Sequence, residues 1–342
     1  MVRPNTAVPI EAYVPILKGK SAEYGALESC TSDRLVPLVE VTAPETAASA
    51  ITRAWSHPDD VIWVHSLNFG DAEEVDFAGS IESLFDALRG VVPVVPVITV
   101  SEGPATLLAI KRIITTDDRG VVLRIDAEDI LDEDLDTSAD IESTLEELGL
   151  HPGKVDLVID AGLLEGSAKV QAALASRCLA LLPRLNEWRT VVVAFSGFPI
   201  PLSDIVPRSS VRAVPRTDAA AFVATARVSP RDIVFSDYTL GSPSYDGVPF
   251  TPVPNIRYAA AAEWIIHRAK ERKGPAPQYR ALAAAVVAAP YYSGPSFSPG
   301  DQQISDTASG AAGPGNPTTH LRAGISRHLH VVLERLATLG EP

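Results

Sequence analysis

Short apolar runs recur along the chain and predict a series of buried strands. The runs are rich in Val, Ile and Leu and are almost continuously apolar, which is typical of strands covered on both faces, as in a parallel sheet. Strands with one solvent-exposed face would instead alternate apolar and polar residues. The predicted strands cover residues 13–18, 35–41, 61–67, 91–100, 120–126, 155–160, 190–198 and 232–238.

Segments with helical spacing of apolar residues separate these runs. Strand and helix alternate eight times, which predicts an α/β protein with a (β/α)8 TIM-barrel-like fold. A doubly wound open sheet is the alternative, and it often carries a glycine-rich turn after its first strand. The chain contains no GxGxxG and no GxxxxGK[ST] sequence, so a nucleotide site of either kind has no support.

The end of the chain differs from this pattern and predicts a C-terminal helical extension. We expect the barrel to span residues 1–273 and the extension, packed on it, to span residues 274–342. The stretch IRYAAAAEWIIHRAKERK, residues 256–273, is expected to be the helix that follows the eighth strand. Residues 320–338 carry apolar side chains at helical spacing and predict a final amphipathic helix. The extension either closes the barrel mouth or braces the outside.

Composition narrows the classes of partner. The net charge is −14, which argues against an extended nucleic-acid surface, because such a surface needs clustered Lys and Arg. No apolar run approaches the roughly 20 residues of a membrane span, and the N-terminus lacks the apolar core of a signal peptide. Cys30 and Cys178 lie in predicted helices without a CxxC motif, which favours buried thiols in a reducing compartment. We therefore expect a cytoplasmic protein without a membrane partner.

The ends of the predicted strands carry charged residues. In a barrel the side chains alternate between interior and exterior, and the carboxyl ends of all strands open onto one mouth. Counting back by two along each run predicts a single charged pocket at that mouth. The polar residues expected to face it are Lys18, Glu40, His65, Thr99, Arg124, Asp126, Asp160, Ser196 and Asp237.

These residue types suggest chemistry with an anion and a metal. Glu40, Asp126 and Asp237 offer the oxygen ligands that Mg²⁺ or Mn²⁺ prefers. The catalytic candidates are His65, Asp126, Asp160 and Lys18, as acid, base or charge-neutralising groups.

Substrate binding is expected from the loops after the last two strands, SGFP (196–199) and YTLGSP (238–243), because barrels often bind phosphate there through backbone N–H groups. Arg124 supplies positive charge for the same small anionic ligand. The substrate-binding candidates are Arg124, Ser196, Gly197, Tyr238 and Gly241.

The residues leave three hypotheses open. The first is a metal-assisted phosphoester hydrolase that acts on a small anionic substrate. The second is a non-catalytic module that senses a ligand or binds a protein partner. The third is a purely structural layer of ion pairs, in which Lys18 pairs with Glu40, and Arg124 with Asp126 or Asp160.

Several stretches also resemble a known family. YVPILKGKSAEYGAL (13–27), PLVEV (37–41), FSDYTLGSP (235–243), IRYAAAAEWIIHR (256–268) and the tail beginning FSPGDQQ at residue 297 are similar to the beta family protein group, the T4 beta protein-like proteins of bacteria and phages. The resemblance extends over about residues 13–335. The family tail often has a His-His pair, whereas this chain has Arg327-His328. The resemblance implies no defined activity; through the family's association with phages and mobile elements it implies a role in phage–host conflict.

Overall fold

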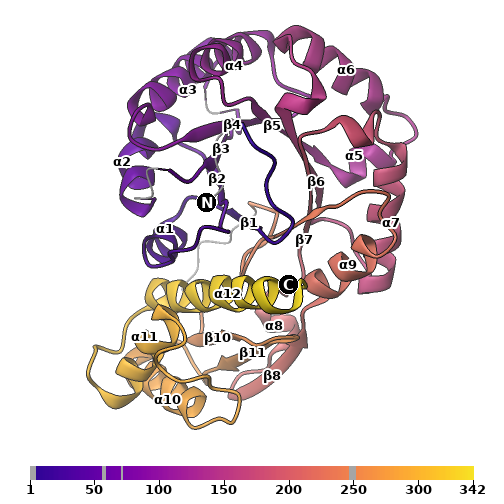
Figure 1. Cartoon of the computed structure of the whole chain (residues 1–342). Coiled ribbons are helices and arrows are strands. Elements are labelled where there is room, and N and C mark those ends of the chain that lie inside the picture. The colour runs from indigo at the N-terminus through magenta and orange to yellow at the C-terminus, as the bar shows by residue number, and fades with distance from the viewer. Residues whose placement is uncertain (1–4, 56–58, 71, 246–251) are drawn as a thin grey trace.

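Eight parallel strands close into a barrel in a computed structural model of the chain, which describes residues 5–55, 59–70, 72–245 and 252–342 (Figure 1). Each strand pairs with the next, and the last pairs with the first. The predicted (β/α)8 barrel is thereby confirmed. Its strands are β1 (Tyr13–Leu17), β2 (Leu38–Val41), β3 (Ile62–Ser66), β4 (Val94–Ile98), β5 (Val121–Asp126), β6 (Val155–Ala161), β7 (Thr190–Phe195) and β9 (Val234–Asp237).

Helices surround the barrel and connect its strands (Figure 1). Local sequence sets several of their ends. Helix α4 begins at Pro104, where the missing N–H of proline has no partner to lose. Helix α6 ends at Leu148 and is capped by Gly149, which takes a left-handed conformation with φ 70°. The helices are α1 (Ser21–Glu28), α2 (Pro44–Ala54), α3 (Glu74–Leu88), α4 (Pro104–Asp117), α5 (Ala127–Leu131), α6 (Thr137–Leu148), α7 (Ala168–Leu181), α8 (Leu202–Ile205) and α9 (Thr217–Ala226).

Two hydrophobic layers stabilise the barrel, one on each face of the sheet. Inside the barrel, Ile16 lies opposite Leu38, and Leu38 lies opposite Trp63. The interior layer continues with valines of β4, β5, β6, β7 and β9. The outer layer, which includes Leu17 and Phe235, packs against the helices. Both faces of each strand are therefore apolar, which explains the continuous apolar runs of the sequence.

A three-stranded antiparallel sheet packs against the extension, in the order β10 (Asn255–Ala259), β11 (Glu263–Arg268) and β8 (Ser210–Pro215). The helix predicted over residues 256–273 is wrong, because this segment supplies the hairpin of β10 and β11. Its run of alanines favours a helix locally. Pairing with β8, a segment more than forty residues earlier in the chain, selects the strand instead. Helices α10 (Pro275–Val287) and α11 (Pro299–Ser309) are the first helices of the extension and share an apolar cluster with this sheet.

The final helix, α12 (Pro317–Leu339), confirms the amphipathic helix predicted there. It packs against α1 and β1, and in Figure 1 it takes a place in the ring of helices between α1 and α9. Ile325, Leu329 and Leu336 are among its buried residues. The helix therefore braces the outer wall of the barrel in the position of the eighth barrel helix. The boundary between barrel and extension at residue 273 stays a prediction.

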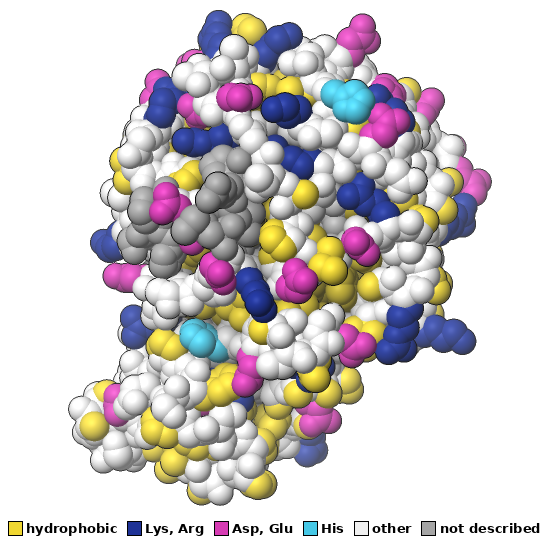
Figure 2. All heavy atoms as spheres, viewed as in Figure 1, with side chains coloured by type: hydrophobic (Ala, Val, Ile, Leu, Met, Phe, Trp, Pro, Cys, Tyr) yellow, Lys and Arg dark blue, Asp and Glu magenta, His cyan; other side chains and the backbone are white. Residues whose placement is uncertain are grey.

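The surface mixes charges of both signs. On the face shown in Figure 2, Lys and Arg side chains are interspersed with Asp and Glu side chains. Within the described ranges, no helix combines the length and the apolarity that crossing a bilayer requires.

Candidate functional site

Arg124 lies at the centre of a buried polar cluster at the top of the barrel interior. Its Nε and Nη2 donate to Asp160 Oδ2 at 2.9 and 2.6 Å, and its Nη1 donates to Glu40 Oε1 at 2.7 Å. Nη1 also lies 3.1 Å from His65 Nδ1, and Nη2 donates to the hydroxyl of Tyr238 at 2.7 Å. These contacts use all five N–H groups of the guanidinium. We call Arg124, Glu40, His65, Asp160 and Tyr238 the Arg124 cluster.

Charge and burial set the protonation of this cluster. Burial opposes the charge of Arg124, but Tyr238, Asp160 and Glu40 outweigh that effect and hold its pKa well above the ordinary value. Burial, with the charge of Arg124, lowers the pKa of His65 well below its ordinary value. His65 is therefore neutral, and it accepts the Arg124 bond at Nδ1, so its proton lies on Nε2. The Tyr238 hydroxyl in turn donates to Asp160.

Four members of this cluster are among the residues that the sequence predicts at the mouth. Glu40, His65, Arg124 and Asp160 come from β2, β3, β5 and β6, and all face the interior as the alternation along their strands predicts. Arg124 is only 8% exposed. A buried arginine with every donor occupied stabilises the arrangement of these strands and has no N–H left for an incoming anion.

The loop after β9 reaches back over this cluster. Lys18 Nζ donates to the carbonyl oxygens of the segment 243–244 and lies 3.9 Å from the centre of the Tyr245 ring. The Tyr245 hydroxyl donates to Glu40 Oε2 at 2.7 Å, and its ring packs against Phe69. Burial lowers the pKa of Lys18, an effect that Glu40 partly offsets. The sequence pattern gives no signal for Tyr245, because it lies in a loop beyond the last barrel strand.

Asp126 lies at the end of β5, beside the Arg124 cluster, with an exposed side chain. Partial burial and the charge of Asp160 raise its pKa to about 6, although Arg124 opposes the shift. A carboxyl group that titrates near neutral pH can donate or accept a proton in a reaction. Asp126 is therefore the residue at this mouth best suited to acid–base chemistry.

Asp237 faces away from the mouth, so the inward direction expected for it is wrong. Strand register places Ser236 opposite Val14 and Ala194, both of which point into the barrel. Tyr238, two residues further along, therefore points inward, and Asp237 points outward. A shift of one residue exchanges the two faces of a strand. The predicted metal ligands Glu40 and Asp237 thus lie on opposite faces of the barrel wall.

A second buried cluster surrounds Asp237 on the outer face of the wall. His328 Nε2 of α12 lies 2.7 Å from its Oδ2, and Arg216 Nη2 lies 3.7 Å from the same oxygen. The Tyr13 hydroxyl donates to Oδ1, and Arg216 also pairs with Asp218 at 3.1 Å. Burial favours the neutral acid, but His328, Arg216 and Tyr13 outweigh it and lower the pKa of Asp237 to about 2. We call these five residues the Asp237 cluster.

The other predicted binding residues are spread over the loops after β7 and β9. Ser196 is half-buried directly after β7. A side chain at Gly197 would lie 2.7 Å from Thr217 Oγ1, so this glycine faces α9. Gly241 donates its N–H to the carbonyl of Tyr238 at 2.8 Å, within a turn. The substrate-binding roles of Ser196, Gly197 and Gly241 stay predictions.

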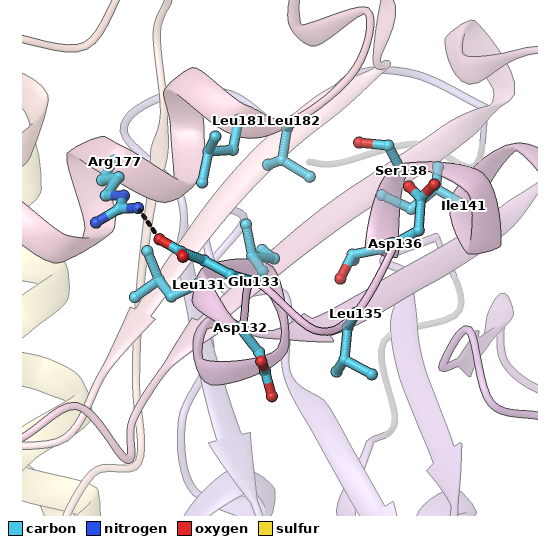
Figure 3. A pocket seen from close by; sticks show the side chains of 12 residues that line it. Leu131, Asp132, Glu133, Leu135, Asp136, Ser138, Ile141, Arg177, Leu181 and Leu182 are labelled. Carbon is cyan, nitrogen blue, oxygen red and sulfur yellow. Dashed lines mark ion pairs between the residues drawn. The ribbon is translucent and has the colours of Figure 1, made fainter.

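A cavity of about 210 Å³ lies outside the barrel, between the α5–α6 connection and α7 (Figure 3). Arg177 and Glu133 form an ion pair of 3.5 Å at its edge, and both side chains are exposed. Leu181 and Leu182 line another side. The cavity contains none of the residues predicted for the mouth. Among the described residues, no group of three or more His, Cys, Asp or Glu side chains is placed to hold a metal ion.

Most of the chain matches the model of a known protein family. The model of a family described as Beta protein matches residues 13–334. The comparison with curated proteins finds no match.

Solved structures similar to the chain include two of a pyruvate carboxylase and one of an aldolase. The carboxyl transferase domain of Rhizobium etli pyruvate carboxylase is 10% identical over 95% of this chain and 47% of its own, with a TM-score of 0.40. The complete multifunctional pyruvate carboxylase of the same organism is 11% identical over 94% and 27%, with a TM-score of 0.41. The YdjI aldolase of Escherichia coli K12 is 10% identical over 98% and 92%, with a TM-score of 0.29. The chain spans about half of the carboxyl transferase chain.

Proposed function

The chain belongs to the Beta protein family, and we propose that it is a ligand-sensing barrel that binds a small anion at its mouth. The observation that carries this proposal is the contact between Lys18 and the loop segment 243–245. Lys18 donates to two carbonyl oxygens and lies against the Tyr245 ring, and it forms no ion pair with a residue in the described ranges. The ammonium group is thus held by neutral groups that an anion can replace.

Replacing these neutral groups by an anion is favourable, because hydrogen bonds between charged partners are about twice as strong as those between neutral ones. The anion and the loop compete for Lys18, so binding shifts the position of the loop. Tyr245 reports this shift, because its hydroxyl also bonds Glu40. Anion binding at Lys18 therefore changes the position of a surface loop, and a protein partner can recognise the changed loop.

The geometry supports binding better than it supports a metal-assisted hydrolase. That mechanism needs carboxylates gathered round one cation and cationic donors for the phosphoryl oxygens. Glu40 and Asp237 lie on opposite faces of the wall, and the donors of Arg124 are all occupied. The role in phage–host conflict belongs to this proposal through the family resemblance alone.

An acid–base enzyme is the second candidate. Asp126 favours it, because its pKa is raised to about 6 and its carboxyl group is accessible at the mouth. In that case Mg²⁺ or Mn²⁺ supports turnover, and Asp126→Asn removes it.

The test is a ¹⁹F NMR titration of protein labelled with 3-fluorotyrosine, in which Tyr245→Phe assigns the Tyr245 signal. We expect inorganic phosphate, at constant ionic strength, to shift this signal saturably in the native protein and in the control Lys169→Ala, an exposed lysine of α7. Lys18→Ala is expected to abolish the shift. A Tyr245 signal that ignores phosphate, sulfate and acetate, or an equal shift in Lys18→Ala, overturns the proposal. Release of nitrophenol from p-nitrophenyl phosphate that Asp126→Asn abolishes would replace it by the enzyme candidate.

A further inference from the structure

Strand β8 forms one edge of the three-stranded sheet (Figure 1). On one side it pairs with β11, and among the described strands none pairs with its other side. Most residues of β8 are exposed, whereas most residues of β11 are buried. We call the unpaired side the β8 edge. It contains none of the residues at the mouth, so a role for it goes beyond the function proposed above.

The hydrogen-bond pattern of the sheet shows which backbone groups of β8 point outward. In an antiparallel pair of strands, hydrogen-bonded and non-hydrogen-bonded positions alternate along each strand. The N–H of Arg216, directly after β8, donates to the carbonyl of Ala262, directly before β11, at 2.8 Å. The residues at even-numbered positions of β8 face β11 in the same way. Val211 and Ala213 therefore direct their N–H and C=O groups to the β8 edge.

The other side of β11 supports this assignment. The N–H of Ala260, directly after β10, donates to the carbonyl of Glu263 at 2.8 Å. The odd-numbered residues of β11 thus bond to β10, and its even-numbered residues bond to β8. Ser209 has a left-handed backbone with φ 54°, so the regular edge begins after it. Within the ranges that the structure describes, the N–H groups of Val211 and Ala213 have no acceptor.

Apolar side chains beside the β8 edge are incompletely covered. Val211 lies opposite His267, and Ala213 lies opposite Ile265. Ile265 belongs to the apolar cluster that the sheet shares with α10 and α11. Val211 is 46% exposed, although His267 is buried. A further strand at the edge would extend the apolar face and cover Val211 and Ala213, because side chains on neighbouring strands pack in pairs.

Positive charge lies at the β8 edge. The exposed side chain of Arg212 donates through Nη1 to the carbonyl of Val211 at 3.3 Å, which places the guanidinium beside an outward-facing carbonyl. Residues 207–216 contain arginines but no acidic residue. Opposite charges on neighbouring strands stabilise their pairing, and like charges destabilise it. The edge therefore favours an extended segment that carries carboxylates.

A second copy of β8 fits this edge poorly. If Val211 of one copy paired antiparallel with Ala213 of another, the two Arg212 side chains would lie directly opposite each other. Like charges in that position destabilise the pair. Charged side chains on edge strands prevent self-association in many proteins for this reason.

We propose that the β8 edge binds an extended segment of a partner protein in which acidic and apolar residues alternate. In recognition by strand addition, main-chain hydrogen bonds supply affinity and alternate side chains supply specificity. In antiparallel pairing, the apolar residues lie opposite Val211 and Ala213, and an acidic residue lies opposite Arg212. The apolar residues then donate their own backbone N–H groups to β8, because they occupy the hydrogen-bonded positions.

The experiment is fluorescence anisotropy with a labelled peptide of alternating Glu and Val residues, as long as β8. We expect the native protein and Arg112→Ala, an exposed arginine of α4, to bind it equally. Ala213→Pro removes an outward N–H and no bond to β11, as proline on an edge strand allows. Its affinity is expected to fall by at least about tenfold, because a carbonyl of the peptide loses its donor. Methylation of the valine nitrogens of the peptide is expected to weaken binding similarly.

Arg212→Glu tests the charge of the partner. We expect this variant to bind the Glu and Val peptide about fivefold more weakly, because an attractive pair across the strands becomes a repulsive one. A peptide of alternating Lys and Val residues is expected to show the opposite preference, with tighter binding to Arg212→Glu than to the native protein.

Three results would overturn this inference. They are absence of binding of the Glu and Val peptide to the native protein at millimolar concentration, equal affinity in Ala213→Pro with an unchanged melting temperature, and an unchanged peptide preference in Arg212→Glu. If Ala213→Pro melts at a lower temperature, the methylated peptide and Arg212→Glu decide, because both leave the backbone of β8 as it is. Dimerisation of the native protein that Arg212→Ala strengthens, without peptide binding, would assign the edge to a second copy instead.

Discussion

His328 of α12 and Asp237 of β9 form a buried pair, with Nε2 2.7 Å from Oδ2, across the junction between the final helix and the barrel wall. Both side chains are buried. Arg216 and Tyr13 contact the same carboxylate. The junction is therefore held by charge as well as by apolar packing, and its strength depends on the ionisation of Asp237.

This pair predicts a dependence of stability on pH. The pKa of Asp237 is lowered from 3.8 to about 2 in the folded protein. A carboxyl group with a lowered pKa contributes stability above its unfolded pKa, and the contribution is lost as the pH falls through the folded value. We expect the free energy of unfolding, measured with urea, to decrease from about pH 4 toward pH 2 by about 2 kcal/mol through this group.

The variant Asp237→Asn tests whether Asp237 causes this pH dependence of the free energy of unfolding. The variant is expected to be less stable than the native protein at pH 7 and to lose much of the change between pH 4 and 2. Asp232→Asn, an exposed carboxyl close by in the sequence, serves as the matched control. An Asp237→Asn protein with the same pH profile as the native protein would contradict the role given to the pair.

Removal of one partner from the Arg124 cluster is expected to be strongly destabilising. Arg124→Leu leaves Glu40 and Asp160 buried without their counter-charge, which costs about 3–5 kcal/mol. Arg112→Ala breaks an exposed ion pair with Glu82, and a change below about 1 kcal/mol is expected. The measurement is the urea concentration at the midpoint of unfolding, compared between Arg124→Leu and Arg112→Ala. Similar midpoints would show that the cluster does not hold the strands together.

Asp126 is expected to destabilise the native protein near neutral pH. Its pKa rises from 3.8 to about 6 on folding, so its favourable contribution is present at low pH and is lost as the pH rises through about 6. Since the side chain is exposed and water screens its charge, we expect Asp126→Asn to gain about 1 kcal/mol or less at pH 8. The gain should vanish below about pH 4. Unfolding curves at the two pH values provide the test, and a loss of stability at pH 8 would contradict it.

A side chain at Gly162 is expected to destabilise the protein. A Cβ atom there would lie 2.6 Å from the Tyr238 ring and 2.7 Å from Pro243, and Arg124 and Asp160 hold Tyr238 in place. Gly162→Ala should therefore cost about 1–3 kcal/mol. Gly79→Ala is the control, because Gly79 lies in α3 with open space around it and alanine favours a helix by about 1 kcal/mol. In thermal unfolding, the melting temperature should fall in Gly162→Ala and rise in Gly79→Ala. A Gly162→Ala protein with an unchanged melting temperature would contradict the close contact with Tyr238 and Pro243.

The strands were predictable because their signal is local. A strand buried on both faces is a short apolar run, and residues such as Val121 and Val155 mark it directly. Alternation along these runs then places Glu40, His65, Arg124 and Asp160 on one face. The hairpin at residues 255–268 carries no comparable signal. Its strand form depends on β8, which is distant in the sequence, while its alanines locally favour a helix.

The site was predictable only where the sequence shows which side chains of a strand face the barrel interior. Asp237 and Tyr238 are adjacent polar residues at the end of β9, and the choice between them depends on the register against β1 and β7. That register is a property of three strands together, so the sequence of one strand does not contain it. The same limit applies to Tyr245, which bonds Glu40 from the loop after β9, and to Arg257 of β10, which donates to the carbonyl of Leu240 in that loop.

The position of α12 bears on how the protein is made. A ribosome synthesises β1 first, yet the helix that covers the outer side of Tyr13 and Leu17 comes only after β9, the hairpin of β10 and β11, α10 and α11. During translation this apolar surface stays uncovered for some three hundred residues. Nascent chains are therefore expected to need a chaperone, or a temporary internal contact, until residues 317–339 leave the exit tunnel.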